Sequence, residues 1–458
     1  QGKTDQFHRL MQLLDRDTFP DVSSIAADRV RPFVVRTEKR AAIDAEGKPL
    51  FKPRMTRLQP VAWLDRHSAQ QGLYEAVTEY VRHGYNQAMA AKQRHIGFLM
   101  ILMQRLVTSS TAAIRTTLEK RLLALDDDHA QLKLFPAERA EDWHELSGED
   151  QIDLAVAFEA LADERKDVEA LLFLARETEV QGTDAKAEAL LELIYKIQQE
   201  ENDPDLKVLV FTEFVPTQAM LADFLESRGF SVVTLNGSMD LEARSRTQKA
   251  FSQDARILIS TDAGGEGLNL QFCHVIVNFD MPWNPMRVEQ RIGRVDRIGQ
   301  PFVVRAINFV LEDTVEYRVR EVLETKLAVI AEEFGVDKAA DVMDSVEAEP
   351  LFDELFVNGL QNPDAIEADC ETVVSQLRTA IAEHNQSSQL LSGGHDLDAS
   401  DARKWRDHPA QFWLERAITS GLPIRGGQAT READAWHVRW SGDGETSSVC
   451  FDARTAEG

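Results

Sequence analysis

Two stretches decide the fold of this chain: Ile259-Ser-Thr-Asp-Ala-Gly-Gly-Glu-Gly-Leu-Asn-Leu270 and Gln290-Arg-Ile-Gly-Arg-Val-Asp-Arg-Ile-Gly-Gln300. The first places three glycines directly after an apolar strand, where a backbone has to come close to another group. The second spaces arginines at positions 291, 294 and 297, so that all three would point the same way on a helix. A strand, a glycine-rich turn and an arginine-bearing helix together suit the recognition of phosphate groups.

Apolar runs around these stretches predict an α/β domain. The runs are rich in Val, Ile and Leu, and segments with helical spacing separate them. Such strands are typical of a parallel sheet with helices on both faces. The predicted strands are residues 208–211, 231–235, 256–260, 274–279 and 303–309. A helix over about residues 184–199 is expected to open the same domain.

The regions on either side of this domain differ in character. Residues 70–182 show helical spacing nearly throughout, with apolar stripes that predict a helical bundle. An acidic stretch extends from about residue 331 to residue 400. The last fifty or so residues alternate apolar and polar positions and predict a small α+β module. Its four tryptophans, at 405, 413, 436 and 440, are interpreted as core residues rather than as base-binding residues.

The formal charge of −26 is distributed unevenly. The net charge is +6 for residues 1–135, −15 for 136–206, −2 for 207–330 and −15 for 331–458. The acidic residues therefore lie in two blocks beside a nearly neutral region that holds the two decisive stretches. Because local patches decide where a phosphate backbone can bind, the acidic total does not exclude a nucleic acid as partner.

Composition excludes several other classes of protein. No run approaches eighteen apolar residues, so no transmembrane helix and no membrane partner are expected. Cys273, Cys370 and Cys450 lie far apart, which argues against a disulfide framework or a zinc site and favours a cytoplasmic protein. The run of aspartates at 126–128 is interpreted as a solvated turn, because consecutive side chains point in different directions. No metal site is therefore expected in this chain.

The two decisive stretches resemble motifs V and VI of the superfamily-two helicases and translocases. The ending Arg-Ile-Gly-Gln at 297–300 narrows the resemblance to the Swi/Snf-type group. Within roughly residues 183–330, residues 207–214 resemble motif IV, and residues 235–239 and 278–285 resemble the turns before motifs V and VI. Residues 33–40 resemble the linker after the first lobe. Residues 104–110 resemble the helical insertion of bacterial relatives near the RNA-polymerase-associated ATPases and the phage-defence helicases.

The resemblance implies an α/β fold: the second RecA-like lobe of a helicase, with a large helical insertion and a small C-terminal α+β module. The expected domains are the end of the first RecA-like lobe and a linker (1–55), the helical insertion (56–182), the second RecA-like lobe (183–330), a helical and acidic connector (331–400) and the start of an accessory α+β domain (401–458). The chain is thus expected to be the C-terminal half of a longer protein.

The resemblance also assigns roles to individual residues. Arg294 and Arg297 are the expected catalytic residues, as arginine fingers that stabilise charge on the transferring γ-phosphoryl group. The glycines at 264, 265 and 267 are expected to permit positive φ and to offer free amides. Nucleotide binding is expected at Gly265, Glu266, Gly267, Gln290 and Arg291. Nucleic-acid binding is expected at Thr212, Asn236, Gly237, Thr261 and Asp262.

ATP and Mg²⁺ are the cofactors implied for the full-length protein, with the magnesium ligands in the first lobe. The tripeptide Gly2-Lys3-Thr4 has the form of a Walker A ending, but no Asp-Glu pair at a strand end follows it, so it is interpreted as a loop. The isolated chain is therefore expected to lack ATPase activity. The implied partners are double-stranded DNA and the first RecA-like lobe of the same protein. Partners from defence systems or transcription are left open.

The implied function is that of the C-terminal half of an ATP-dependent translocase or helicase on double-stranded DNA, which supplies arginine fingers and backbone grip. The biological process, phage defence or nucleoprotein remodelling, is left open. One alternative is a non-catalytic DNA- or protein-docking module, favoured by the lack of Walker A and Asp-Glu-x-His motifs in the chain. The other is an RNA-directed superfamily-two helicase, against which the ending at 297–300 argues.

Overall fold

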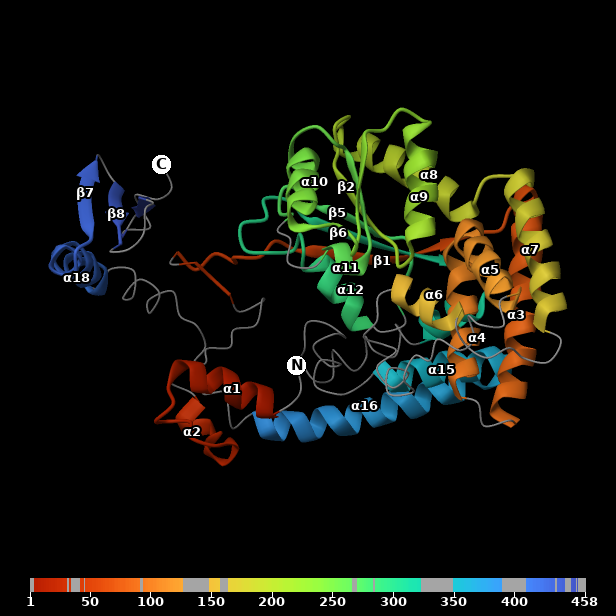
Figure 1. Ribbon diagram of the computed structural model, residues 1–458, viewed down its shortest axis with the longest axis horizontal. Coiled ribbons are helices and arrows are strands. Elements are labelled where there is room, and N and C mark those ends of the chain that lie inside the picture. Colours follow the sequence, from red (N-terminus) through yellow and green to blue (C-terminus); the bar gives the residue numbers. More distant parts are fainter. Residues whose placement is uncertain are drawn as a thin grey trace. The chain divides into compact units, whose positions relative to one another are not determined.

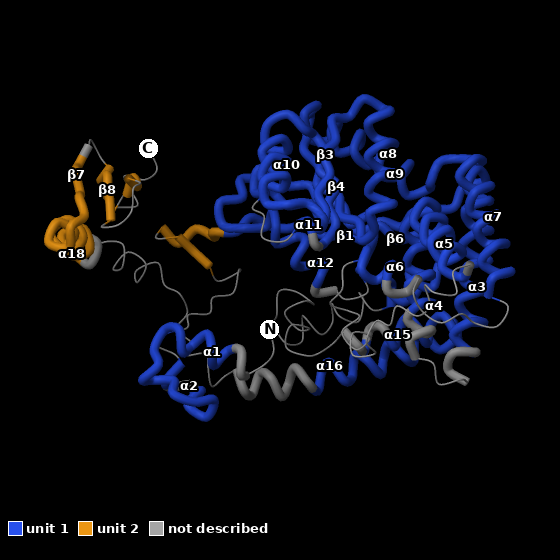
Figure 2. The backbone as a smooth tube through the Cα atoms, viewed as in Figure 1, with its two compact units in different colours: residues 1–36, 51–393 blue, residues 37–50, 394–458 orange. Residues whose placement is uncertain are grey.

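The computed structural model describes residues 4–30, 33, 42–44, 46–90, 94–126, 148–156, 164–265, 270–282, 285–322, 349–388, 409–432, 435–440, 446–449 and 451. The chain divides into two compact units (Figure 2). The larger unit comprises Gln1–Arg36 and Phe51–Gly393, and the smaller one comprises Thr37–Leu50 and Gly394–Gly458.

A six-stranded parallel sheet organises the larger unit (Figure 1). Its strand order is β1-β6-β5-β2-β4-β3, and every neighbouring pair runs parallel. Five of the strands confirm the sequence prediction: β2 (Val208–Phe211), β3 (Val232–Leu235), β4 (Ile257–Ser260), β5 (Val275–Asn278) and β6 (Val304–Leu311). The predicted α/β fold with a parallel sheet is therefore confirmed.

The edge strand β1 (Arg54–Val61) was not predicted. It pairs in parallel with β6 over its full length, from Arg54 opposite Val304 to Val61 opposite Leu311. Its sequence contains Pro60, which has no N–H to donate and is tolerated in a strand at the edge of a sheet. The sheet thus begins inside the region expected to hold the linker and the helical insertion.

Alternate residues of the central strands enter two separate cores, one on each face of the sheet. Val208 and Val210 pack with helices α8 (Ala185–Glu201) and α9 (Val215–Glu226). Leu209 and Phe211 pack with helices α10 (Leu241–Gln253) and α12 (Pro285–Ile292). This period of two is what a pleated strand covered on both faces requires.

The predicted bundle is present in the described part of residues 68–181. Its helices are α3 (Ser68–Ala90), α4 (Arg94–Ser109), α5 (Thr111–Asp126), α6 (Gly148–Val156) and α7 (Glu164–Gln181). The apolar stripes predicted on two of them form its core, where Leu99, Leu106 and Leu118 have no exposed surface. We call residues 68–181 the helical segment.

Part of the expected acidic connector is helical. Helices α15 (Glu349–Gln361) and α16 (Ile366–Ser388) contribute Phe356 and Leu377 to the core of the helical segment. The 3₁₀ turn Pro363–Ala365 joins the two helices. Residues 323–348 and 389–408 lie outside the described residues.

The smaller unit contains the expected α+β module: helix α18 (Ala410–Ile424) and the antiparallel strands β7 (Gln428–Glu432), β8 (Ala435–Arg439) and β9 (Ser447–Val449). Its tryptophans do not form the expected core. Trp413 is 59% exposed and Trp440 is 50% exposed. The half-buried Trp436 donates its indole N–H to Glu415 Oε1 at 3.0 Å, and Trp405 lies outside the described residues.

The N-terminal elements are short. Helix α1 (Thr4–Leu14), the 3₁₀ turn Val22–Ser24 and helix α2 (Ala27–Val30) enclose a small core of Met11, Phe19 and Val30. A further 3₁₀ turn, Asp65–His67, precedes α3. Among the described residues, no helix is both long and apolar enough to cross a membrane.

Candidate functional site

Three neighbouring strands bring predicted site residues to one edge of the sheet, and a fourth adds an aspartate that was not predicted. Thr212 follows β2, Asn236 follows β3 and Thr261 follows β4, while Asp280 lies two residues beyond the end of β5. Open parallel sheets bind their ligands outside the carboxyl ends of the strands. The topology therefore gathers the candidates at the edge where a ligand would be expected.

The glycine-rich turn is held tightly against the neighbouring turn. A methyl group on Gly264 would lie 2.5 Å from the carbonyl oxygen of Leu235 and 2.7 Å from Asn236 Cα. On Gly265 it would lie 2.9 Å from the ring of Phe211. The predicted close approach of the backbone is thus present, and its partner is the turn after β3.

The predicted glycine conformation is wrong in its detail. Residues 262–265 form the short helix α11 (Asp262–Gly265), and neither Gly264 nor Gly265 has a positive φ. The amide of Gly265 donates to the carbonyl of Thr261 at 3.0 Å, so it is not free. Absence of a side chain, rather than a left-handed backbone, is what this turn requires. Glu266 and Gly267 lie outside the described residues.

Arg291 is a buried anchor. Its Nε lies 2.5 Å from Asp262 Oδ1 and its Nη2 lies 2.9 Å from Asp262 Oδ2. Its Nη1 donates to the backbone oxygen of Asp280 at 2.6 Å, and the guanidinium lies over the ring of Phe211. Burial works against the charge, but the Asp262 carboxylate outweighs it and raises the pKa of Arg291.

This geometry engages two residues for which other contacts were predicted. Only 2% of the Arg291 side chain is exposed. Its function in the structure is to fasten α12 to the turn after β4. The Asp262 side chain keeps 30% of its surface exposed, yet both of its oxygens bind Arg291. Two residues predicted to contact different ligands therefore contact each other.

The three arginines do not share one helix. Helix α12 ends at Ile292, and residues 293–300 continue as turns, with Gly299 at φ +91°. The turn begins where Arg294 N bonds Arg291 O at 3.1 Å and Val295 N bonds Ile292 O at 3.1 Å. We call residues 293–300 the arginine turn. It contains Arg294 and Arg297, which are both half-buried, whereas the buried Arg291 lies before it on α12.

The arginine turn is fixed from several directions. The Nε of Arg297 donates to the carbonyl of Gly293 at 3.0 Å, and the carbonyl of Arg294 accepts from the amide of Leu270 at 3.1 Å. The side-chain amide of Gln300 donates to three backbone carbonyls, the nearest being that of Gln271 at 2.9 Å. Gln290, on the preceding helix, is exposed.

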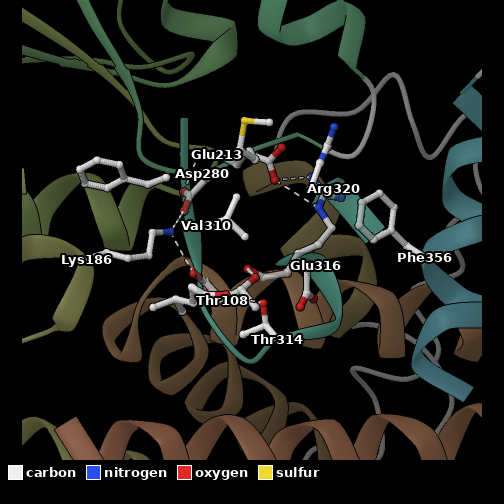
Figure 3. A pocket seen from close by; sticks show the side chains of 13 residues that line it. Thr108, Lys186, Glu213, Asp280, Val310, Thr314, Glu316, Arg320 and Phe356 are labelled. Atoms are coloured by element: carbon white, nitrogen blue, oxygen red, sulfur yellow. Dashed lines mark hydrogen bonds and ion pairs between the residues drawn. The ribbon is translucent and has the colours of Figure 1, made fainter. Parts of the chain in front are cut away.

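Thr212 is an internal group. It has no exposed surface, and its hydroxyl donates to Asp280 Oδ2 at 2.5 Å. The Lys186 ammonium lies 2.9 Å from Asp280 Oδ1 (Figure 3). Burial acts to raise the pKa of Asp280, but Lys186 and Thr212 prevail and hold it below the ordinary value. The hydroxyl of Thr212, a residue predicted to bind nucleic acid, thus bonds to a carboxylate within the protein.

The remaining nucleic-acid candidates lie together on the turns after β3 and β4. Thr261 N donates to Leu235 O at 2.9 Å, which joins the two turns. Asn236 is half-buried and donates to Gln218 Oε1 at 3.1 Å, while Gly237 is exposed. Thr261 itself is 6% exposed. Of the five candidates, Gly237 is therefore the most accessible.

Sequence reasoning missed two residues that build this edge and a third, at the start of β1, that binds α12. Asp280 is a lone carboxylate directly after an apolar strand, and Lys186 is a lysine on the otherwise apolar face of α8. Arg54 of β1 makes two bonds of 2.6 Å to Glu289 of α12. The first two show a sequence signal, a charge at a position whose neighbours are buried. The third has none, because β1 itself was not predicted.

No metal centre is evident in the part of the chain that the structure describes. Nowhere there do three or more His, Cys, Asp or Glu side chains gather as potential ligands. The chemistry of the edge is that of hydrogen-bond donors and guanidinium groups, which suit phosphate oxygens.

Parts of the chain are similar in sequence to known helicases. Residues 185–299 match the model of the helicase conserved C-terminal domain. The ATP-dependent helicase YqhH of Bacillus subtilis is 40% identical over 152 residues, which make up 33% of this chain and 26% of that protein. The RNA polymerase-associated protein RapA of Pseudomonas putida is 28% identical over 328 residues, 69% of this chain and 30% of that protein. The chain spans less than a third of the length of either relative.

Among solved structures, the C-terminal part of the Fun30 ATPase domain is similar with a TM-score of 0.40 and 18% identity, over 68% of this chain and 98% of that one. The Hef helicase domain of Pyrococcus furiosus has a TM-score of 0.38 and 15% identity, over 59% of this chain and 58% of that one.

Proposed function

We propose that this chain, which carries the helicase C-terminal domain of a bacterial Swi/Snf-type helicase, supplies the second lobe of an ATP-dependent translocase on double-stranded DNA. The observation that carries the proposal is the arginine turn. It lies after α12, is fastened through Arg291, and presents Arg294 and Arg297 as half-buried rather than buried groups.

The residues present fit one side of a bound nucleotide. When ATP is bound, its γ-phosphoryl group develops charge on oxygens that guanidinium groups can stabilise. In this chain Arg297 and Arg294 would meet those oxygens, and the bond from Arg297 Nε to Gly293 fixes the plane of the first guanidinium. The carboxylates that would hold Mg²⁺ are proposed to lie on the first RecA-like lobe, together with the phosphate-binding loop.

Duplex DNA is proposed to bind at the turns after β3 and β4. Gly237 and Ser238 are exposed there, and α10 directly beyond carries Arg244, whose Nη2 donates to Gly237 O at 3.3 Å. A backbone grip of this kind reads phosphates and not bases, so binding should be insensitive to sequence.

A phosphate-release assay tests the proposal. The protein that joins this chain to a first RecA-like lobe should hydrolyse ATP in response to duplex DNA, and Arg297→Ala should abolish the turnover while nucleotide binding persists. Arg228→Ala is the matched control, because this arginine lies beyond α9 and stacks on Phe224. The chain alone should show no turnover. Hydrolysis that survives Arg297→Ala would contradict the assignment of the arginine turn.

The docking-module alternative makes a different prediction. If the chain serves only to bind DNA or protein, the protein with both lobes should still bind DNA. Arg294→Ala and Arg297→Ala should then leave its rate of ATP hydrolysis unchanged. Stimulation by single-stranded RNA and not by duplex DNA would instead favour the RNA-directed helicase. Phage defence or nucleoprotein remodelling is the process that we propose for the whole protein.

A further inference from the structure

The Asp280 carboxylate is a meeting point for four donors from three parts of the larger unit. Lys186 of α8 binds Oδ1 at 2.9 Å. The hydroxyl of Ser109, the last residue of α4, donates to Oδ2 at 2.8 Å. The hydroxyl of Thr212 and the amide of Glu213, which follow β2, donate to the same oxygen at 2.5 and 3.1 Å. In Figure 3, the side chains of Lys186 and Asp280 point toward one another, and a dashed line marks the ion pair between them.

The backbone of the same residue holds the arginine anchor. Asp280 O accepts a hydrogen bond from Arg291 Nη1 at 2.6 Å. Arg291 in turn binds Asp262 and closes α12 onto the turn after β4. Asp280 therefore binds the helical segment through its side chain. Through its carbonyl oxygen it binds Arg291, which lies just before the arginine turn.

Further polar contacts bind the end of helix α4 to α8, to α9 and to the turn after β2. Lys186 Nζ also donates to the carbonyl of Thr108 at 2.9 Å. The hydroxyls of Ser109 and Ser110 each lie 2.7 Å from the hydroxyl of Thr217. Arg105, one turn earlier in α4, lies 2.5 Å from Glu213 Oε2. These contacts join α4 to the residues that surround the Asp280 carboxylate.

Burial makes this arrangement sensitive to displacement. Asp280 is 6% exposed and Lys186 is 3% exposed, while Thr212 is wholly buried. A buried ion pair is tolerated only when its geometry is good and its other lone pairs are bonded, and loss of one partner leaves an uncompensated charge. If α4 moves, Asp280 must therefore move with it or lose the bond from Ser109, one of its four donors.

We propose that Asp280 is a positioning residue. It holds Arg291, and with it the arginine turn, in a position that depends on the contact between Asp280 and the end of α4. The inference rests on the proposed function, since it makes the helical segment a regulator of the arginine fingers. A partner that binds the helical segment and shifts α4 would change the rate of ATP hydrolysis without touching the nucleotide.

Amide hydrogen exchange on the chain as it stands tests the coupling without any need for catalysis. Asp280→Asn keeps the shape of the side chain and removes its charge. It should speed exchange in residues 285–297 about tenfold, because the anchor loosens. Ser109→Ala, on the helical segment, should speed exchange in the same residues by a smaller factor. Helix α10 packs on the same face of the sheet as α12, and its exchange should stay unchanged.

Asp254→Asn is the matched control, because Asp254 is exposed and lies outside these contacts. It should leave exchange in residues 285–297 as in the wild type. If Asp280→Asn and Ser109→Ala speed amide exchange only around residues 104–110, Asp280 serves merely to hold the end of α4 in place, and the proposal is overturned. Should Asp280→Asn fail to fold, Ser109→Ala alone decides between these outcomes.

Kinetics in the protein with both lobes separate positioning from plain stability. Asp280→Asn should lower kcat about tenfold or more and leave the KM for ATP near the wild-type value, because the arginines act on transition-state charge. An unchanged kcat would overturn the proposal. A wild-type protein without DNA-stimulated hydrolysis would instead defeat the proposed function, and the exchange experiment would still decide whether Asp280 couples the two regions.

Discussion

Arg291 and Asp262 form a two-bond ion pair across 29 residues of sequence, with both carboxylate oxygens engaged. The arginine is buried and the aspartate is part-exposed, so the pair has an inner and an outer end. This pair, and not a shared helix, ties the glycine-rich turn to the arginine-bearing segment. The two stretches that stand out in the sequence are thus physically joined.

Asp262→Ala should destabilise the protein strongly. It leaves the Arg291 guanidinium buried without its carboxylate, which we expect to cost about 3 kcal/mol or more in the free energy of unfolding. Urea unfolding followed by circular dichroism measures the loss. Asp223→Ala, at an exposed position on α9, should change stability by less than about 0.5 kcal/mol. Equal effects of the two substitutions would show that the ion pair contributes nothing.

Gly264→Ala should also destabilise, for a steric reason. The added methyl group would meet the backbone of Leu235 and Asn236, which cannot move as a flexible side chain would. We expect a cost of about 1–3 kcal/mol. Gly72→Ala on helix α3 is the control, because a methyl group there meets nothing within 4 Å. It should stabilise the helix by up to about 1 kcal/mol. A neutral Gly264→Ala would refute the close approach.

Stability should depend on pH through Glu316. Burial raises the pKa of this carboxyl from 4.5 to about 7. A raised folded-state pKa means that the folded protein holds the proton where the unfolded chain has lost it. The resulting stabilisation is complete below about pH 4.5, declines as the pH rises toward 7 and is absent above that. Its full size is roughly 3 kcal/mol.

Glu316→Gln isolates this effect from the other titrating groups. The amide resembles the protonated acid, so the variant should be more stable than the wild type at pH 8, and the difference should shrink as the pH falls to 5. Thermal unfolding at several pH values measures both curves. A difference that does not vary with pH would mean that Glu316 titrates normally in the folded state.

DNA affinity should respond to charge at the turn after β3. Ser238→Glu adds a negative charge beside exposed Gly237 and should weaken duplex binding severalfold at low salt. Ser252→Glu, near the far end of α10, makes the same change away from the proposed contact and should have little effect. Both proteins should lose affinity steeply between 50 and about 200 mM salt. Fluorescence anisotropy with labelled duplexes of unrelated sequence tests both expectations, and equal weakening by the two variants would exclude this turn as the contact.

Five strands could be predicted because each is a short apolar run between helical segments. Strand β1 could not be predicted, because its sequence, Arg-Met-Thr-Arg-Leu-Gln-Pro-Val, is typical of a polar loop. Only its pairing with β6 makes it a strand. The general position of the site followed from the same logic, because strand ends in a parallel sheet share one edge.

Individual roles at the site were harder to predict. The spacing of the three arginines predicts one shared helix, but the helix ends after the first of them, and only packing decides which one is buried. Thr212 follows its strand at a position open to ligands in principle. Its hydroxyl nevertheless donates a hydrogen bond to Asp280, which follows a neighbouring strand. Such pairings join residues distant in sequence, and no local pattern records them.

The pairing of β1 with β6 imposes an order on folding during synthesis. Strand β1 leaves the ribosome before β6, which follows only after roughly 240 further residues, and at typical elongation rates these take on the order of ten to fifty seconds. Throughout that time β1 has no strand to pair with, while the helical segment can already assemble from contacts close in sequence. Closure of the sheet edge is therefore a late event, and the nascent chain exposes an unpaired strand that chaperones would be suited to protect.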